Sequence, residues 1–161
     1  YCYIGRISHE KGIKTLIAAA NRLPHKLVII GKGPLDAEMK KLAGPNVEFA
    51  GFKQWNEIKR IVGQARFCVI PSECYENNPL SVIESQCLGT PVLGAQIGGI
   101  PELIQEGCNG LHFRSRDTDD MTAKIQAMYD APFDYPSIAL EAKKRYNSET
   151  YYKQLIQLYN L

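Results

Sequence analysis

The chain has 161 residues, of which 45% are apolar and 22% are charged, and its formal net charge is +2. A chain of this length and composition can bury a sizeable hydrophobic core as one globular domain. The near-neutral charge and the lack of long basic runs argue against a nucleic-acid-binding face or a membrane-binding patch. No apolar run approaches the roughly 18 residues of a membrane-spanning helix.

The five cysteines are an odd number and include no C-x-x-C pair. This pattern argues against a disulfide framework and against a zinc site. Cys68 and Cys87 fall in apolar surroundings and are predicted to pack as small hydrophobic side chains. We therefore expect a reducing compartment, and hence a cytoplasmic protein.

Apolar runs and helical periodicity alternate along most of the chain. The runs predict six strands, over residues 1–4, 26–30, 47–50, 66–70, 91–93 and 110–113. The periodic segments predict helices over 11–23, 35–42 and 54–64, one opening at Pro79, and further ones over 101–105, after 117–120, over 137–146 and over 149–159. The first strand opens the sequence at Tyr1 without an initiator methionine, so we expect this chain to be part of a longer protein.

Strands that alternate with helices through short loops favour an α/β fold with a doubly wound parallel sheet of about six strands. We predict one Rossmann-like domain over residues 1–161, with closing helices at about 137–160. In the common strand order 3-2-1-4-5-6 the direction of winding reverses between strands one and four, and ligands bind there, beyond the carboxyl ends of the strands. The loops after these two strands carry the charged candidate residues.

The loop after the fourth strand has the residues of an anion site. Asn78 is a good helix N-cap and Pro79 suits the first helical position, so the backbone N–H groups of Leu80, Ser81 and Val82 are expected to point out of the helix start. A helix N-terminus of this kind attracts phosphate.

Two glutamates, Glu76 and Glu84, flank the same helix start. Carboxylates would repel a phosphate unless they bind another part of the ligand, and hydroxyl groups are the donors that they accept well. A phosphate joined to a polyol is a sugar nucleotide. The alternative interpretation is a pair of surface glutamates beside an ordinary capped helix.

Three other patterns are weaker. The G-x-G at 31–33 lacks the third glycine of a dinucleotide fingerprint, and Pro34 starts the next helix directly. The acidic run at 117–120 could suggest a metal site, but acids in a first helical turn favour the helix dipole without an ion, so no metal site is predicted. His9 lies between basic residues, where a general base is conceivable but not favoured.

Taken together, the segments 5–12, 31–34, 76–84 and 98–102 resemble the donor-binding half of the family-four retaining glycosyltransferases, which have the two-domain GT-B fold. The resemblance covers nearly the whole chain, with the motifs in the same order. It implies that this chain is the C-terminal domain and that an acceptor-binding domain would precede Tyr1.

The resemblance also implies roles for single residues. Arg6 and Lys11 match the basic pair that clamps the donor diphosphate, Arg6 as a planar fork and Lys11 as a point charge. Glu76 matches the acid that contacts donor-sugar hydroxyls near the reacting centre, and Glu84 the acid that holds the ribose. Glu76, Arg6 and Lys11 are thus the catalytic candidates. In the alternative interpretation all four are solvated charges.

The remaining donor contacts implied by the resemblance lie in four loops. Residues after the second strand border the nucleotide, one residue after the third lines the base, the helix start faces the phosphate, and a later glycine pair lets backbone approach the sugar. These residues are Gly33, Pro34, Phe52, Asn77, Asn78, Pro79, Leu80, Ser81, Gly98 and Gly99.

The implied activity is transfer of a sugar from a UDP- or GDP-linked donor to an acceptor hydroxyl with retention of configuration, in polysaccharide or glycoconjugate synthesis. Because the basic pair does what a metal does in other transferases, no metal cofactor is expected. The acceptor, a glycan or a lipid-linked molecule, would bind through the preceding domain. The alternatives are a non-catalytic nucleotide-binding module and a sugar-nucleotide epimerase of similar architecture.

Overall fold

The computed structural model describes residues 1–159, and its centre is a six-stranded parallel sheet in the order β3-β2-β1-β4-β5-β6. This confirms the predicted strand order. The predicted closing-helix range reaches residue 160, which lies outside the described residues. The strands are β1 (Cys2–Ile4), β2 (Leu27–Ile30), β3 (Val47–Gly51), β4 (Cys68–Ile70), β5 (Val92–Ala95) and β6 (Gly110–Phe113).

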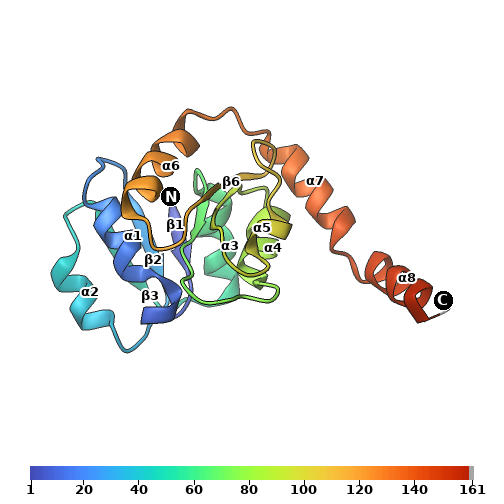
Figure 1. Ribbon diagram of the computed structural model, residues 1–161, viewed down its shortest axis with the longest axis horizontal. Coiled ribbons are helices and arrows are strands. Elements are labelled where there is room, and N and C mark those ends of the chain that lie inside the picture. The colour runs from blue at the N-terminus through green and yellow to red at the C-terminus, as the bar shows by residue number, and fades with distance from the viewer. Residues whose placement is uncertain (160–161) are drawn as a thin grey trace.

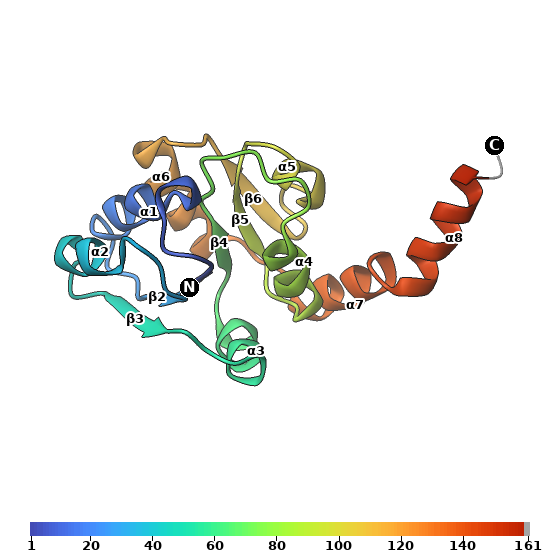
Figure 2. The ribbon, with the colours of Figure 1, turned by 90° about the horizontal axis from the view of Figure 1, so that it is seen from below.

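Helices cover both faces of the sheet (Figures 1 and 2). On one face lie α1 (Ile13–Ala20), α2 (Asp36–Leu42) and α6 (Thr118–Asp130), and Figure 2 shows α3 (Trp55–Gln64) and α4 (Leu80–Cys87) on the other. The short helix α5 (Ile100–Leu103) follows β5, and α7 (Tyr135–Arg145) packs on α4. The last helix, α8 (Ser148–Tyr159), lies away from the sheet in both views.

The four central strands, β1, β2, β4 and β5, are apolar along their whole length, as expected for strands that are covered on both sides. The edge strands β3 and β6 contain Glu48 and His112. All residues of β4 and β5 are buried. The helix α1 buries Ile13, Leu16, Ile17 and Ala20 at the predicted helical spacing, and it packs on α6. Cys68 is buried in β4 as predicted, whereas Cys87 is only half-buried.

Several predicted helix starts were wrong. The helix α1 begins at Ile13 rather than Lys11, since Lys11 lies in a 3-10 turn, η1 (His9–Lys11), and Gly12 separates the two with a positive φ of 65°. The helix α7 begins at Tyr135, two residues before the predicted start at residue 137, because the Asp134 side chain caps it. Pro136 is tolerated in its first turn instead of breaking the chain.

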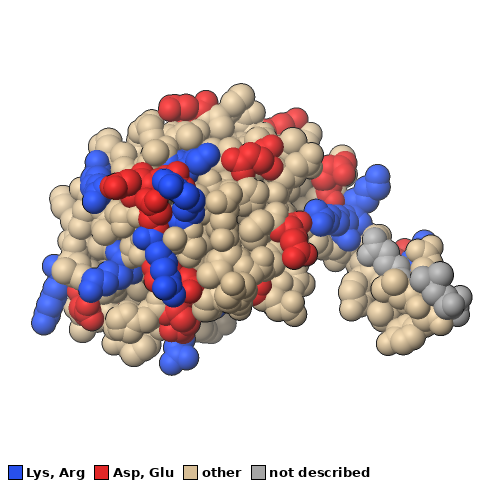
Figure 3. Space-filling view, viewed as in Figure 1, with Lys and Arg blue, Asp and Glu red and all other residues tan. Residues whose placement is uncertain are grey.

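The outer surface mixes charges. On the face shown in Figure 3, Lys and Arg side chains lie next to Asp and Glu side chains rather than in separate patches. Large apolar side chains of α8, including Tyr152 and Tyr159, are exposed, so this helix does not pack its apolar face on the core. Within residues 1–159, no helix has both the length and the apolar composition needed to cross a membrane.

Candidate functional site

A cleft of about 460 Å³ opens at the carboxyl edge of the sheet, between the loops that follow β1 and β4. These are the two neighbouring strands at which the strand order reverses, so the cleft lies where this topology places ligands. Seven of the predicted site residues line it: Arg6, Lys11, Glu76, Asn78, Pro79, Leu80 and Ser81.

Lys11 and Glu76 meet directly inside this cleft. The Lys11 Nζ lies 2.5 Å from Glu76 Oε1, and the buried Ser72 hydroxyl donates to the same oxygen at 2.9 Å. The Glu76 side chain is only 19% exposed. Two donors therefore fix one carboxylate oxygen of Glu76, while Oε2 accepts no hydrogen bond from the described residues.

Arg6, from the loop after β1, also lines the cleft. The buried Tyr3 hydroxyl donates to the Arg6 carbonyl oxygen at 2.7 Å and so holds the loop after β1, and burial raises the pKa of this phenol. The Arg6 side chain is exposed, and no carboxylate among residues 1–159 forms an ion pair with it. Its charge is available to a ligand in the cleft.

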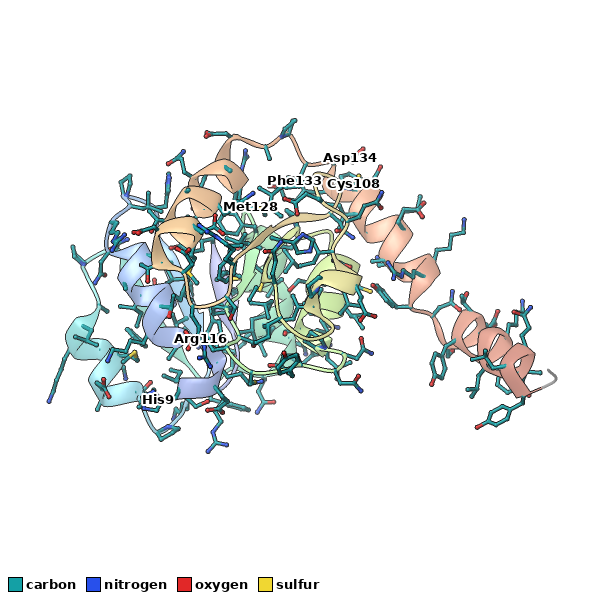
Figure 4. All side chains as sticks on the ribbon, in the orientation of Figure 1. His9, Cys108, Arg116, Met128, Phe133 and Asp134 are labelled. Atoms are coloured by element: carbon teal, nitrogen blue, oxygen red, sulfur yellow. The ribbon has the colours of Figure 1, made fainter. Side chains whose placement is uncertain are left out.

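The loop that carries Glu76 is anchored through Glu73. The Glu73 N–H donates to the Glu10 carbonyl oxygen at 2.9 Å, and the Thr15 hydroxyl donates to Glu73 Oε1 at 2.5 Å. From the β6–α6 loop, Arg116 donates to the Glu73 carbonyl oxygen at 3.2 Å. Figure 4 labels Arg116 in this loop, above His9 of η1. Three residues distant in sequence from Glu73, which are Glu10, Thr15 and Arg116, thus hold this loop in place.

Sequence reasoning missed Ser72, Glu73 and Arg116. Their partners are 4 to 58 positions away along the chain, and no local pattern indicates those pairings. In the structure, the backbone marks Arg116 as unusual, because it has a φ of 66° although the residue is not glycine. Such a conformation costs free energy and persists where surrounding contacts hold it.

The start of α4 differs from the prediction. Pro79 is the N-cap, and Asn78 is an exposed residue of the cleft rim that makes no capping bond. The Val82 N–H donates to the Pro79 carbonyl oxygen at 3.0 Å, so it is not available to a ligand. The N–H groups of Leu80 and Ser81 donate to no partner among the described residues and face the same end of the helix.

Glu84 lies one turn further along α4. It follows Leu80 by four residues and Ser81 by three, so it shares their face of the helix, although it does not line the cleft itself. It is half-buried, and burial raises the pKa of its carboxyl group, with no compensating hydrogen bond or ion pair from residues 1–159.

At three of the glycines predicted to contact the donor, a side chain would clash with the backbone of a neighbouring loop. Gly98 has a φ of 57°, and a Cβ there would lie 2.5 Å from the Glu76 carbonyl oxygen. The Gly99 N–H donates to that same oxygen at 2.7 Å, and a Cβ on Gly99 would lie 2.1 Å from the Asn77 carbonyl oxygen. A Cβ on Gly33 would lie 2.2 Å from the Ile7 carbonyl oxygen.

None of these glycines lines the cleft. Gly98 and Gly99 pack against the backbone of the loop that carries Glu76. Gly33 lets the loop after β2 pack on the loop after β1. Asn77 and Pro34 are exposed and lie outside the cleft lining, as does His9.

A second, smaller hollow of about 240 Å³ adjoins the cleft, and the two share Ile4, Gly5 and Arg6. It contains Phe52, whose side chain is 66% exposed, at the end of β3. Lys32 and Lys53 lie at its sides. The cleft and this hollow are therefore adjacent, over the loops after β1, β2, β3 and β4.

A third hollow, also of about 240 Å³, lies between α4 and α7. Cys108 and Asp134 line it and lie close together in Figure 4. Because Cys108 precedes β6, this hollow is at the edge of the sheet where the strands begin. It contains none of the predicted site residues.

The strand order, the helices on both faces and the cleft at the reversal point define a Rossmann-like α/β domain of the kind found in GT-B glycosyltransferases. Residues 1–131 match the protein-family model described as Glycosyl transferases group 1. The chain belongs to this family.

Curated relatives include glycosyltransferases of different kinds. The chain is 34% identical over 131 residues to the sulfoquinovosyl transferase SQD2 of Arabidopsis thaliana, covering 78% of this chain and 26% of the relative. It is 29% identical over 157 residues to a glycogen synthase of Mycobacterium tuberculosis, covering 91% and 38%. A GDP-mannose-dependent alpha-mannosyltransferase of Corynebacterium glutamicum is 33% identical over 109 residues, covering 68% and 26%. The chain therefore spans well under half of each of these relatives.

Solved structures share the fold. HepE of Anabaena, in complex with UDP, superposes with a TM-score of 0.85 at 21% identity, covering 99% of this chain and 48% of that one. The sucrose-phosphate synthase of Thermosynechococcus elongatus gives a TM-score of 0.83 at 27% identity, covering 99% and 44%. The predicted fold class is confirmed.

The first prediction concerns the packing of the cleft loops. A Cβ on Gly12 would lie 1.8 Å from the Pro71 carbonyl oxygen, and the residue has a φ of 65°. Gly12→Ala should therefore lower the free energy of unfolding by about 2 kcal/mol or more, measured by urea denaturation.

The matched control is Gly63→Ala, since Gly63 lies within α3 and a Cβ there meets nothing within 4 Å. This change should stabilise the protein by about 0.5–1 kcal/mol, because alanine is the better helix former. Equal stability of Gly12→Ala and the unmodified protein would contradict the packing described for this loop.

The second prediction concerns the carboxyl group of Glu84, which has no partner in the described part of the chain. Because its pKa is raised in the folded protein, folding favours the protonated form, and stability is lost as the pH rises through the folded-state pKa. Glu84→Gln should abolish this loss and be more stable than the unmodified protein at pH 7, by less than about 1 kcal/mol because the group is partly solvated.

Thermal unfolding between acidic and neutral pH measures this difference. Glu102→Gln, at an exposed residue of α5, is the control and should leave the pH dependence unchanged. A Glu84→Gln protein less stable than the unmodified one at pH 7 would show that the carboxylate has a stabilising partner.

Proposed function

We propose that the cleft binds the diphosphate of a nucleoside-diphosphate sugar. The observation that supports this most strongly is that one cleft brings together Arg6, Lys11 and the two N–H groups at the start of α4. A guanidinium forks onto phosphate oxygens, an ammonium adds a point charge, and helix-start amides bind anions without any conformational change.

Glu76 and Glu84 would bind the hydroxyl groups at the two ends of the diphosphate. Glu76 is already held by Lys11 and Ser72 through one oxygen, which leaves Oε2 for a donor-sugar hydroxyl. Glu84, which has no hydrogen-bond or ion-pair partner within residues 1–159 and lies one helical turn further along α4, would accept from the ribose hydroxyls. A hydroxyl donor there would offset the cost of burying its charge.

The adjoining hollow would hold the nucleobase. Its exposed Phe52 offers an aromatic face, and stacking of a base on such a face is favourable for every base. Gly33 and Pro34 would act indirectly, by fixing the conformation of the loop that borders this hollow.

The proposed reaction transfers the sugar to an acceptor hydroxyl with retention of configuration. As the bond from sugar to diphosphate breaks, negative charge grows on the leaving oxygen, and Arg6, Lys11 and the amides of Leu80 and Ser81 lie where they stabilise it. These groups can carry the charge without a metal ion, and we propose that none is required.

We further propose that this chain is the C-terminal, donor-binding half of a two-domain cytoplasmic enzyme of polysaccharide or glycoconjugate synthesis. It spans only part of relatives named for sulfoquinovosyl transfer and for amylovoran biosynthesis. A preceding domain would bind the acceptor, so this chain alone should bind the donor and transfer nothing. With the full-length protein, the anomeric configuration of the product tests retention, and an inverted product contradicts it.

Charge reversal at Arg6 tests donor binding. Arg6→Glu should weaken the binding of UDP and GDP to this chain by about 100-fold, because it replaces a phosphate-facing cation by an anion. Calorimetric titration measures the change.

Lys143→Glu is the matched control, since Lys143 is exposed on α7 and lies outside the cleft lining. It should bind both nucleotides as the unmodified chain does. Failure of the folded, unmodified chain to bind either nucleotide at millimolar concentration, or equal loss in both variants, would refute the proposed donor site.

A further inference from the structure

The loop between β6 and α6 contacts the loop that carries Glu76 at two successive residues. The Ser115 hydroxyl donates to the Ser72 carbonyl oxygen at 3.2 Å, and the Arg116 guanidinium donates to the Glu73 carbonyl oxygen at the same distance. From these contacts we infer that Ser115 and Arg116 are positioning residues, which fix the Glu76 carboxylate for the donor sugar. This inference rests on the proposed function and adds two residues that lie outside the cleft lining.

A tight turn presents these two side chains together. The Asp117 N–H donates to the Arg114 carbonyl oxygen at 3.1 Å, so Ser115 and Arg116 are the two central residues of a four-residue turn. Arg116 has a φ of 66°, which is typical of the third residue of a type II turn, a place that glycine usually occupies. Asp120 Oδ2 accepts from the Arg114 N–H at 2.6 Å, and Asp117 Oδ2 lies 3.0 Å from the Arg114 guanidinium. Asp117 and Asp120 thus hold the turn in place.

Stability alone does not explain the conformation of Arg116. Among residues 1–159 it is the only non-glycine residue with a positive φ, and this conformation costs free energy. Its Nε lies 3.7 Å from Glu73 Oε2, in an ion pair whose arginine side chain is 71% exposed, and exposed pairs of this kind contribute little to stability. Backbone strain is concentrated at active and ligand-binding sites, and both contacts of Arg116 with Glu73 end on the loop that carries Glu76.

The two residues held in this way lead directly to the Glu76 carboxylate. The buried Ser72 donates its hydroxyl to Glu76 Oε1 at 2.9 Å, so the position of the Ser72 backbone sets the position of that oxygen. Glu73 is also held from α1, because the Thr15 hydroxyl donates to its Oε1 at 2.5 Å. Glu76 Oε2, the oxygen proposed to bind the donor sugar, accepts no hydrogen bond from the described residues. Its position therefore follows from the contacts that fix the rest of the loop.

The test is calorimetric titration of this chain with two pairs of ligands, UDP with UDP-glucose and GDP with GDP-mannose. The measured quantity is the affinity for the nucleotide sugar relative to its nucleotide, in the pair that the chain binds more tightly. Arg116→Gly should lower this ratio by about fivefold, because a misplaced carboxylate loses part of a charged hydrogen bond to the sugar. A purely structural role would weaken both ligands of the pair alike and leave the ratio unchanged.

The variants separate positioning from folding. Glycine suits a φ of 66° better than arginine does, so Arg116→Gly should unfold near the melting temperature of the unmodified chain. Ser115→Ala removes only the hydroxyl and should lower the ratio in the same direction. Arg22→Gly is the matched control, since it makes the same substitution at an exposed residue and breaks an ion pair with Asp119 of α6, outside both the cleft and the adjoining hollow. It should leave the ratio unchanged.

A double-mutant cycle tests whether Arg116 acts through Glu76. Glu76→Ala should itself lower the ratio by about tenfold, since it removes the acceptor of a sugar hydroxyl. Adding Arg116→Gly to Glu76→Ala should lower the ratio no further, because the carboxylate that Arg116 positions is already absent. Independent roles of the two residues would instead give losses that multiply.

The outcomes are distinct. An unchanged ratio in Arg116→Gly overturns this inference, as does an equal fall in Arg22→Gly, a ratio that Glu76→Ala leaves unchanged, or losses that multiply in the cycle. In each of these cases the unmodified chain still binds nucleotide, and the proposed diphosphate site stands. If the folded, unmodified chain binds none of the four ligands, the proposed function itself fails, and the inference with it.

Discussion

The candidate site depends on close backbone packing between loops at the carboxyl edge of the sheet. Gly12 comes so near Pro71 that a methyl group would not fit, and the Glu73 N–H reaches the Glu10 carbonyl oxygen. These contacts join the loop after β1 to the loop after β4. Because they do, Lys11 and Glu76, which are 65 residues apart, form an ion pair in one cleft.

Much of this arrangement could be predicted from the sequence, because it follows from short-range signals and a general rule of topology. Continuous apolar runs such as 27–30 indicate buried parallel strands, and the carboxyl ends of neighbouring parallel strands meet at one edge. The meeting of Arg6, Glu76 and Ser81 in one cleft follows from that rule.

The remainder depends on tertiary contacts that local patterns do not encode. Asn78 has the right chemistry for a cap, yet Pro79, with an extended backbone (φ −66°, ψ 110°), is the N-cap of α4. Gly98 and Gly99 could not be separated from ligand-contacting glycines, because their neighbour, the loop at Glu76, is far away in sequence. Nothing in the sequence around Arg116 indicates its contact with Glu73. Gly98, Gly99 and Arg116 contact the loop that carries Glu76 or Glu73.

The site holds an exposed Arg6 that has no ion-pair partner among residues 1–159, and a partly buried Glu84 whose carboxyl pKa is raised by burial. A diphosphate joined to hydroxyl-bearing groups would satisfy both. The most direct measurement is a ¹⁵N–¹H NMR titration of this chain with UDP. The account predicts that the amide signals of Gly5, Arg6, Leu80 and Ser81 shift together with one affinity. Shifts confined to the hollow between α4 and α7, with those four signals unmoved, would contradict it.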